Sequence, residues 1–207
     1  MLEVLGRSGS INVRKVLWTC DELALDYRHD EWGSGDLSLQ DPSFLQLNPN
    51  ALVPVIRDGD FVLWESNTIC RYLAATAGRT DLLPDRPGPR GLVEQWMDWQ
   101  ATELNNAWRY AFMALVRKSP AHTDANAIKA SVQNWNRLME ILNGALERSG
   151  AYIAGGDFTL ADIVLGLSTH RWFMTPIERP VLASVAAYYE RLSQRAAFRV
   201  HGRNDLP

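Results

Sequence analysis

The chain has 207 residues, of which 46% are hydrophobic and 22% are charged, and its formal net charge at pH 7 is −3. This composition excludes wholesale disorder and a fibrous repeat, and the weak acidity argues against a nucleic-acid-binding protein, which would carry a basic stripe. The length exceeds the usual size of one domain, so we expect two domains. Two cysteines cannot form a disulfide framework, no zinc-ligand spacing occurs, and no apolar stretch approaches the roughly 18 residues that cross a membrane. These features predict a cytoplasmic protein without a metal ion or a membrane anchor.

The first half of the chain alternates strand and helix patterns. Apolar residues recur at helical spacing over 13–23, and Asp58-Gly59 is a strong turn signal between two short apolar runs. Asp41-Pro42 is typical of a helix start, and Ser66 can cap another helix. This order predicts a mixed sheet with helices on both faces. The expected elements are a strand over 2–5, a helix over 12–24, a further strand and a short helix that begins at Asp41-Pro42, a hairpin of strands 53–56 and 61–64, and a helix from Ser66 to near Gly78.

A segment rich in proline and glycine, 84–91, separates this half from one of a different kind. Beyond it no convincing strand pattern occurs, and the apolar residues follow helical spacing. Thr159 and Asp162 are spaced to form a capping box, with Phe158 and Ile163 as its hydrophobic staple. The predicted organisation is a domain over 1–83, a linker over 84–91 and an all-helical domain over 92–207, with helices over 93–115, 128–146, 159–173 and 181–194.

Polar residues stand at the ends of three predicted elements. Ser10 and Asn12 lie at the start of the first helix, where unpaired amide groups and the helix dipole favour an anion, although either side chain could simply cap the helix. Pro54 begins a strand, where proline is unremarkable. Glu65 and Ser66 precede another helix and could hold the ammonium and carboxylate groups of an amino acid, or serve as an ordinary cap. Each loop alone is compatible with a purely structural role.

In this order, the loops resemble the cytosolic glutathione S-transferase family. The resemblance covers the whole chain and suggests a bacterial serine-type member of the theta- or nu-like kind. It implies a thioredoxin-like first domain with the order βαβαββα, followed by an all-helical domain. Four segments carry it: Ser10–Val16 looks like the serine-type active-site segment, Leu47-Asn48-Pro49 with Val53-Pro54 like the cis-proline loop, Trp64–Leu73 like the Glu-Ser helix start, and Phe158–Ile163 like the capping box of the family's helical domain.

The resemblance implies which residues would bind the body of glutathione. Glu65 and Ser66 would bind its γ-glutamyl end, and Val53, before the cis-proline Pro54, would pair with its cysteinyl backbone. The family often has a polar residue where this chain has Leu52, so the usual contact with the glycyl carboxylate is absent. Either another residue supplies that contact or glutathione binds with modest affinity. Weak candidates for it are Arg7, His29, Trp32 and Asn50.

The resemblance also implies how the glutathione sulfur is held. The hydroxyl of Ser10 would donate to it, with Asn12 as a helper or a substitute and Ser8 as an alternative. No tyrosine lies near the end of the first strand, so the tyrosine-type classes do not fit. Cys20 and Cys70 fall within predicted helices and are interpreted as core residues.

The acceptor substrate would bind between the two domains. Four aromatic residues could line this site or could belong to the core: Trp108, Tyr110, Phe112 and Trp172. The leading hypothesis is a homodimeric transferase that conjugates glutathione, its co-substrate, to small hydrophobic electrophiles, as in detoxification, without a metal. Two alternatives stay open, namely a glutathione-dependent disulfide reductase or peroxidase and a non-catalytic binding module of the same fold.

Overall fold

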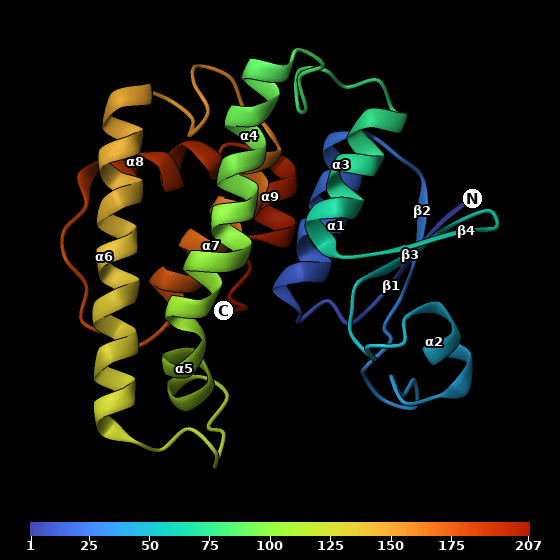
Figure 1. Ribbon diagram of the computed structural model, residues 1–207, viewed down its shortest axis with the longest axis horizontal. Coiled ribbons are helices and arrows are strands. Elements are labelled where there is room, and N and C mark those ends of the chain that lie inside the picture. The colour runs from blue at the N-terminus through green and yellow to red at the C-terminus, as the bar shows by residue number, and fades with distance from the viewer.

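The computed structural model describes residues 1–207 as two parts joined by one connection (Figure 1). The first part contains β1 (Leu2–Leu5), α1 (Ile11–Glu22), β2 (Tyr27–Asp30), α2 (Pro42–Leu47), β3 (Val55–Asp58), β4 (Phe61–Trp64) and α3 (Ser66–Thr76). The strands form one sheet in the order β2-β1-β3-β4. The β1–β2 pair is parallel, whereas the β1–β3 and β3–β4 pairs are antiparallel. The predicted thioredoxin-like domain with its mixed sheet is thereby confirmed.

Helices cover both faces of this sheet because its central strands are apolar on both sides. α1 and α3 lie side by side over one face, where Val4 and Ile56 are fully buried in the main core. α2 covers the other face, where Phe44 packs with Leu5 and Val55 in a separate small core. Both faces of the sheet are therefore closed to solvent near its centre, and the ends of its strands and helices are left to form a site.

The second part is all-helical, as predicted. Its elements are α4 (Pro87–Trp99), the π turn η1 (Gln100–Leu104), α5 (Asn105–Leu115), α6 (Ala125–Ser149), α7 (Leu160–Met174), α8 (Ala183–Leu192) and α9 (Ala196–His201). Figure 1 shows α4, η1 and α5 as one continuous column beside the long α6. α7 is the central helix, since every residue from Leu160 to Trp172 is buried. None of the helices combines the length and the apolar character that crossing a membrane would require.

Several elements differ from the expectation: β3 begins at Val55 and leaves Pro54 outside the strand, and α9 was not predicted. Residues 87–91, predicted as part of the linker over 84–91, form the start of α4, because prolines in the first turn of a helix sacrifice no intrahelical hydrogen bond. The connection between the two parts is the segment 77–86. The single helix predicted over 93–115 is interrupted by η1, whose wider turn rotates the side chains that follow it.

The two parts share a core around Trp18 of α1. Its fully buried ring lies against Phe158 and Phe198, with ring centroids 5.9 and 4.9 Å away. α7 can approach this ring because residue 166 is glycine: a Cβ on Gly166 would lie 3.0 Å from the Trp18 ring and 2.7 Å from Leu192. This packing fixes α1 against the helical part, and with it the position of the N-terminal end of α1.

Candidate functional site

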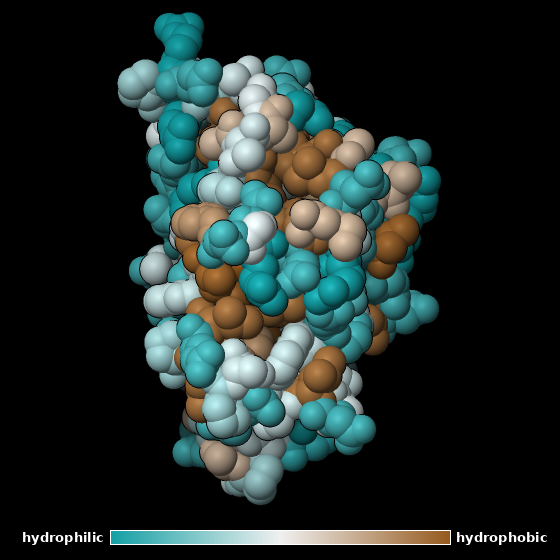
Figure 2. Space-filling model, turned by 90° about the vertical axis from the view of Figure 1, so that its right-hand side faces the viewer, coloured by the Kyte–Doolittle hydropathy of each residue, from teal (hydrophilic) through white to brown (hydrophobic).

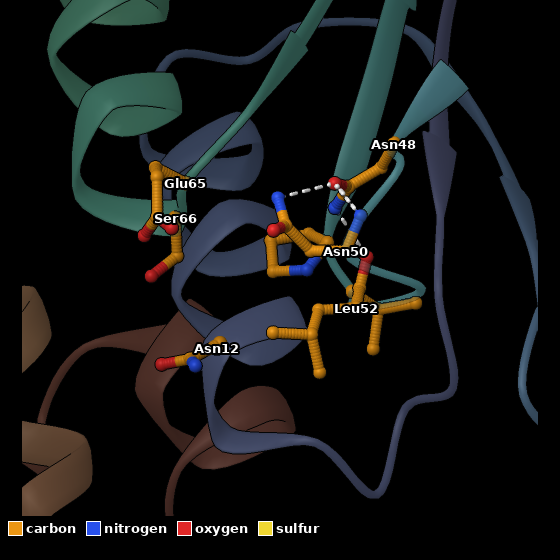
Figure 3. A pocket seen from close by; sticks show the side chains of 8 residues that line it. Asn12, Asn48, Asn50, Leu52, Glu65 and Ser66 are labelled. Atoms are coloured by element: carbon orange, nitrogen blue, oxygen red, sulfur yellow. Dashed lines mark hydrogen bonds between the residues drawn. The ribbon is translucent and has the colours of Figure 1, made fainter. Parts of the chain in front are cut away.

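A cavity opens where the N-terminal end of α1, the loop before β3 and the turn between β4 and α3 meet. Figure 3 shows the α1 and α3 residues on one side of it and the loop residues on the other. Glu65 is the only ionisable residue of the lining, so a ligand here would be recognised mainly by hydrogen bonds. The lining consists of Asn12, Asn48, Asn50, Leu52, Val53, Pro54, Glu65 and Ser66.

The loop before β3 presents its backbone to this cavity. The peptide bond between Val53 and the following proline is cis. Asn48 holds the loop, since its side-chain amide donates to the Leu52 carbonyl oxygen at 2.8 Å and its Oδ1 accepts from the backbone and side-chain amides of Asn50 at 3.1 and 2.9 Å. The loop can lie this close to the end of β1 because residue 6 is glycine: a Cβ on Gly6 would lie 2.8 Å from the Val53 Cβ. The backbone of Val53 is therefore held in a defined position.

The turn between β4 and α3 has an unusual backbone. Glu65 has a φ of 77°, a left-handed conformation that residues with a Cβ seldom adopt. Such conformations cluster at binding sites, where the surrounding structure enforces them. Ser66, predicted as the cap of α3, is its first helical residue, and Glu65 occupies the N-cap position. Since Ser66 is only 6% exposed and lines the cavity, the unpaired amides of the first turn of α3 border it too.

The N-terminal end of α1 brings one of the two leading sulfur-binding candidates into the cavity. Asn12 lines it, and Figure 3 shows no hydrogen bond from its carboxamide to the other lining residues. Ser10 is the N-cap of α1 and makes no side-chain capping hydrogen bond, but it does not line the cavity. Ser8 lies outside the lining as well, and its backbone amide donates to the Glu31 carboxylate at 3.0 Å. The predicted residues that the structure brings together are Asn12, Val53, Pro54, Glu65 and Ser66.

Two asparagines complete the polar lining. Asn50 is one of the weak candidates for a contact with the glycyl carboxylate, whereas Asn48 was not predicted to take part in the site. The other weak candidates are engaged elsewhere: Arg7 and His29 donate to backbone oxygens, and Trp32 packs against α2. The signal that could have identified Asn48 is its place just before a proline, where a side-chain amide commonly stabilises a turn.

A buried lysine lies beneath this site, between the two parts of the molecule. Lys15 of α1 is 1% exposed, and its Nζ donates to Gln100 Oε1 at 2.7 Å and to Asn67 Oδ1 at 3.2 Å. Burial lowers the pKa of Lys15 to about 8, although the charge of Glu65 acts in the opposite direction. Asn67 follows Ser66 in α3, and Gln100 begins η1, so this lysine ties both helices of the cavity to the helical part. Sequence reasoning missed Lys15 because a lysine is ordinarily a surface residue.

The four aromatic residues predicted for the acceptor site fall into two groups. Trp108 and Phe112 of α5 lie together, with ring centroids 5.3 Å apart. The guanidinium carbon of Arg171 is 4.5 and 4.1 Å from the centroids of these two rings. Tyr110 and Trp172 instead direct their polar atoms to α6. The Tyr110 hydroxyl accepts a hydrogen bond from the backbone amide of Asp124, the N-cap of α6. The Trp172 indole N–H donates to the side chain of Asn136. The structure therefore places Trp108 and Phe112 together, whereas Tyr110 and Trp172 each make their own polar contact with α6.

Neither cysteine lies in the cavity. Cys20 and Cys70 are buried and unpaired, and burial raises the pKa of both thiols, that of Cys70 to about 11. No group of three or more His, Cys, Asp or Glu side chains is arranged to hold a metal ion. The chemistry that this site can perform thus depends on hydrogen-bond donors and on the ends of two helices.

Comparisons with known proteins agree along the whole chain. The family model described as glutathione S-transferase, N-terminal domain, matches residues 5–81, and the model described as glutathione S-transferase, C-terminal domain, matches residues 105–196. The chain is 37% identical over 201 residues to glutathione S-transferase GstB of Escherichia coli K12, with 96% of each chain covered. It is 30% identical over 204 residues to glutathione S-transferase 3 of Zea mays, with 95% of this chain and 91% of that one covered. A solved structure of the theta class glutathione S-transferase from Xanthomonas axonopodis pv. citri, with glutathione bound, is similar at a TM-score of 0.92 and 37% identity, covering 100% of this chain and 99% of that chain.

Proposed function

Because this chain belongs to the glutathione S-transferase family, we propose that it conjugates glutathione to small hydrophobic electrophiles and that the cavity at the end of α1 is its glutathione site. The observation that carries this proposal is the meeting of Asn12, Val53, Glu65 and Ser66 in one cavity. Without this meeting in space, only the order of these residues in the sequence would link them to the glutathione-binding residues of the family. Glutathione is the co-substrate in this proposal, and no metal takes part.

The body of glutathione would bind along the cavity through three kinds of contact. Its γ-glutamyl carboxylate would accept hydrogen bonds from the hydroxyl and amide of Ser66, where the dipole of α3 also favours a negative charge. Its ammonium group would face the carboxylate of Glu65. The backbone of Val53 would pair with its cysteinyl residue. The side-chain amide of Asn50 would bind the glycyl carboxylate, in place of the polar side chain that is missing at Leu52.

The sulfur would be held at the N-terminal end of α1, with Asn12 as its first donor. Ser10, the residue that would make the chain a serine-type member, is the second donor, since its hydroxyl is not used in capping. Lowering the pKa of a thiol by about two units takes about 2.7 kcal/mol. A helix N-terminus contributes about 0.3–1 kcal/mol when exposed and about 2 kcal/mol when partly buried, and a hydrogen bond to a charged group adds about 1.5–3 kcal/mol. The helix dipole and one side-chain donor are therefore sufficient together.

Titration of the thiol of bound glutathione tests this assignment. With the ultraviolet absorbance of the thiolate followed against pH, Asn12→Ala is expected to raise its pKa by about one to two units, the equivalent of the lost hydrogen bond. Ser10→Ala is expected to raise it by less. Ser8→Ala is the matched control, because Ser8 precedes the N-cap of α1 by two residues and lies outside the lining, and it should leave the pKa unchanged. An unchanged pKa in both the Asn12 and the Ser10 variant would contradict the assignment.

Substrate assays separate the transferase from its alternatives. A chloronitroarene reports conjugation, hydroxyethyl disulfide reports disulfide reduction, and cumene hydroperoxide reports peroxide reduction. The buried cysteines with raised pKa offer no reactive protein thiol, so the thiolate of glutathione would be the nucleophile in all three reactions, and their relative rates decide between them. Absence of turnover with all three, together with absence of glutathione binding in calorimetry, would leave only a non-catalytic binding module.

The proposed assembly is a homodimer, and the proposed location is the cytoplasm, where unpaired cysteines are the rule. Large hydrophobic side chains are exposed on the first part of the molecule, among them Leu52, Phe61 and Trp64. Figure 2, seen from the side of the sheet and α2, shows hydrophobic residues in groups among hydrophilic ones. A second copy of the chain would cover such side chains. Light scattering is expected to give the mass of two chains, and a single-chain mass would refute the dimer.

A further inference from the structure

Three arginines, termed here the arginine cluster, lie together where the two parts of the molecule meet. Arg14 belongs to α1, Arg171 to α7, and Arg117 to the segment after α5. Arg14 and Arg171 are 1% and 3% exposed, whereas Arg117 is exposed and its guanidinium lies 3.5 Å from the Gly9 carbonyl oxygen. Burial and the charge of Arg117 lower the pKa of Arg14 to about 10. Burial and the charges of the other two lower the pKa of Arg171, so the three charges act on one another.

The arginine cluster has no acidic side chain as a partner. None of the ion pairs within the protein includes any of its members. Arg14 donates to backbone oxygens of Leu206 and Pro207 at 2.8 and 3.0 Å, and Arg171 donates to that of Pro207 at 3.3 Å. The Nε atoms of Arg14 and Arg171 are buried without any hydrogen-bond partner. Three guanidinium groups that lie together and have no acidic side-chain partner produce a positive potential here, which favours an anion nearby.

The arginine cluster also borders the aromatic pair of α5. The guanidinium of Arg171 lies over Trp108 and Phe112, and that of Arg117 is 5.4 Å from the centroid of Phe112. Gly9, which Arg117 approaches, lies just before α1, at the end where the glutathione sulfur would be held. The positive potential and the reacting sulfur would therefore be neighbours, while the buried rings of Trp108 and Phe112 pack against the guanidinium groups.

We propose that the acceptor site prefers electrophiles that carry a carboxylate, which Arg117 binds while Arg14 and Arg171 supply positive potential behind it. This inference rests on the proposed transferase function and specifies its second substrate. Arg117 makes the direct contact because it is exposed, whereas the C-terminal residues occupy donors of the other two.

The reaction with a chlorinated nitrobenzoate illustrates the role of the carboxylate. The thiol proton goes to solvent, and the thiolate sulfur forms a bond to the ring carbon that carries chlorine. The carbon–chlorine bond then breaks with its electron pair and chloride leaves, so that no oxidant or reductant is required. The carboxylate does not react and serves to anchor the ring beside the sulfur.

A matched pair of acceptors tests the inference: para-chloro-meta-nitrobenzoate and the corresponding neutral benzamide, which differ in charge and little in shape. At saturating glutathione, wild type is expected to show the higher kcat/KM with the benzoate once uncatalysed rates are subtracted. Arg117→Gln is expected to lower kcat/KM for the benzoate by about ten- to a hundredfold, as for loss of one charge-assisted hydrogen bond, and to change that for the benzamide by less than about twofold. Arg117→Lys should recover part of the loss, because it keeps the charge without the planar fork.

The control variant is Arg137→Gln on α6. It removes the same charge from an exposed residue whose guanidinium binds only Asn134 of its own helix, and it should leave both acceptors unaffected. Equal kcat/KM for the two acceptors in wild type, or equal losses for both in Arg117→Gln, overturns the inference while turnover of the benzamide still supports the transferase. Absence of turnover with either acceptor, together with absence of glutathione binding, overturns both.

Discussion

The buried Lys15 leads to a stability prediction that can be worked out from its contacts. Lys15→Met replaces the ammonium group by an apolar end of similar length, and leaves Gln100 Oε1 and Asn67 Oδ1 without a donor. Neither amide can turn round without loss, because Gln100 Nε2 donates to Ser168 and Asn67 Nδ2 donates to the Met97 carbonyl oxygen. An unpaired buried acceptor costs about 1–3 kcal/mol, and relief of the buried charge offsets part of that. We expect the free energy of unfolding at neutral pH to fall by about 1–3 kcal/mol.

The pH dependence of this effect is the sharper test. Burial lowers the pKa of Lys15 from 10.5 to about 8, so between these values the unfolded chain still binds a proton that the folded protein has released. The stability contributed by Lys15 therefore rises as the pH increases through this window. At about 1.4 kcal/mol per pKa unit, the rise amounts to at most about 3 kcal/mol. Below the folded-state pKa both states hold the proton, and the contribution no longer changes with pH.

Urea denaturation of wild type and Lys15→Met, from neutral pH to about pH 10, measures both effects. The difference between the two proteins removes the contributions of other titrating groups, and it is expected to widen towards high pH. Lys129→Met, a substitution at an exposed lysine of α6, is the matched control and should show no such widening. A difference that stays constant with pH, or a variant more stable than wild type at neutral pH, would refute the reasoning.

Two further predictions concern the helical part of the molecule. Gly166→Ala is expected to lower the unfolding free energy by about 1–3 kcal/mol in urea, in spite of a helix-propensity gain of about 1 kcal/mol, because its Cβ would lie 2.7 Å from Leu192 and 3.0 Å from Trp18. An unchanged urea midpoint in Gly166→Ala would contradict this prediction, because it would mean that α1 and α7 can separate to admit the Cβ without loss of stability. His170→Gln should make the stability of the protein less sensitive to acid. Burial lowers the pKa of His170 from 6.5 to about 4, and its Nδ1 lies 2.8 Å from the Tyr189 hydroxyl. The stability that the neutral imidazole contributes to the folded protein is therefore lost as the pH falls through this window. Urea midpoints should show wild type losing as much as about 3 kcal/mol more than the variant over that range, and parallel losses would contradict the prediction.

Elements that carry their own polar signals could be predicted from the sequence. Asp41 accepts the Ser43 amide at 2.8 Å at the start of α2, and Asp162 accepts the Thr159 amide at 2.9 Å at the start of α7. Asp58-Gly59 lies at the turn between β3 and β4. In each case a side chain within a few residues satisfies or redirects the backbone, so the information is local.

The residue bounds of β2 and the presence of η1 could not be predicted, because what determines them lies elsewhere in the fold. β2 reads Tyr-Arg-His-Asp, which has no alternating apolar pattern, and it is a strand because it pairs in parallel with β1. η1 places Gln100 between Lys15 and Ser168, with which its side chain makes hydrogen bonds at 2.7 and 2.9 Å. A widened turn costs little when it completes a buried polar network, and that network joins segments distant in sequence.

The glutathione side of the proposed site could be predicted from local sequence signals, whereas the acceptor side depends on contacts between distant segments. The order of the motifs indicated five residues that line the cavity, at the end of α1, in the loop before β3 and at the start of α3, but it did not indicate Asn48. The order of the motifs did not show which residue at the start of α1 enters the cavity, because the directions of Ser10 and Asn12 around a helix differ by about 200°, at about 100° per residue. The acceptor side depends on how α1 is set against α5 and α7, which the close packing of Trp18 on Gly166 determines. No local pattern encodes that contact, and for this reason the aromatic residues predicted for the acceptor site separate into two groups and the arginine cluster was not foreseen.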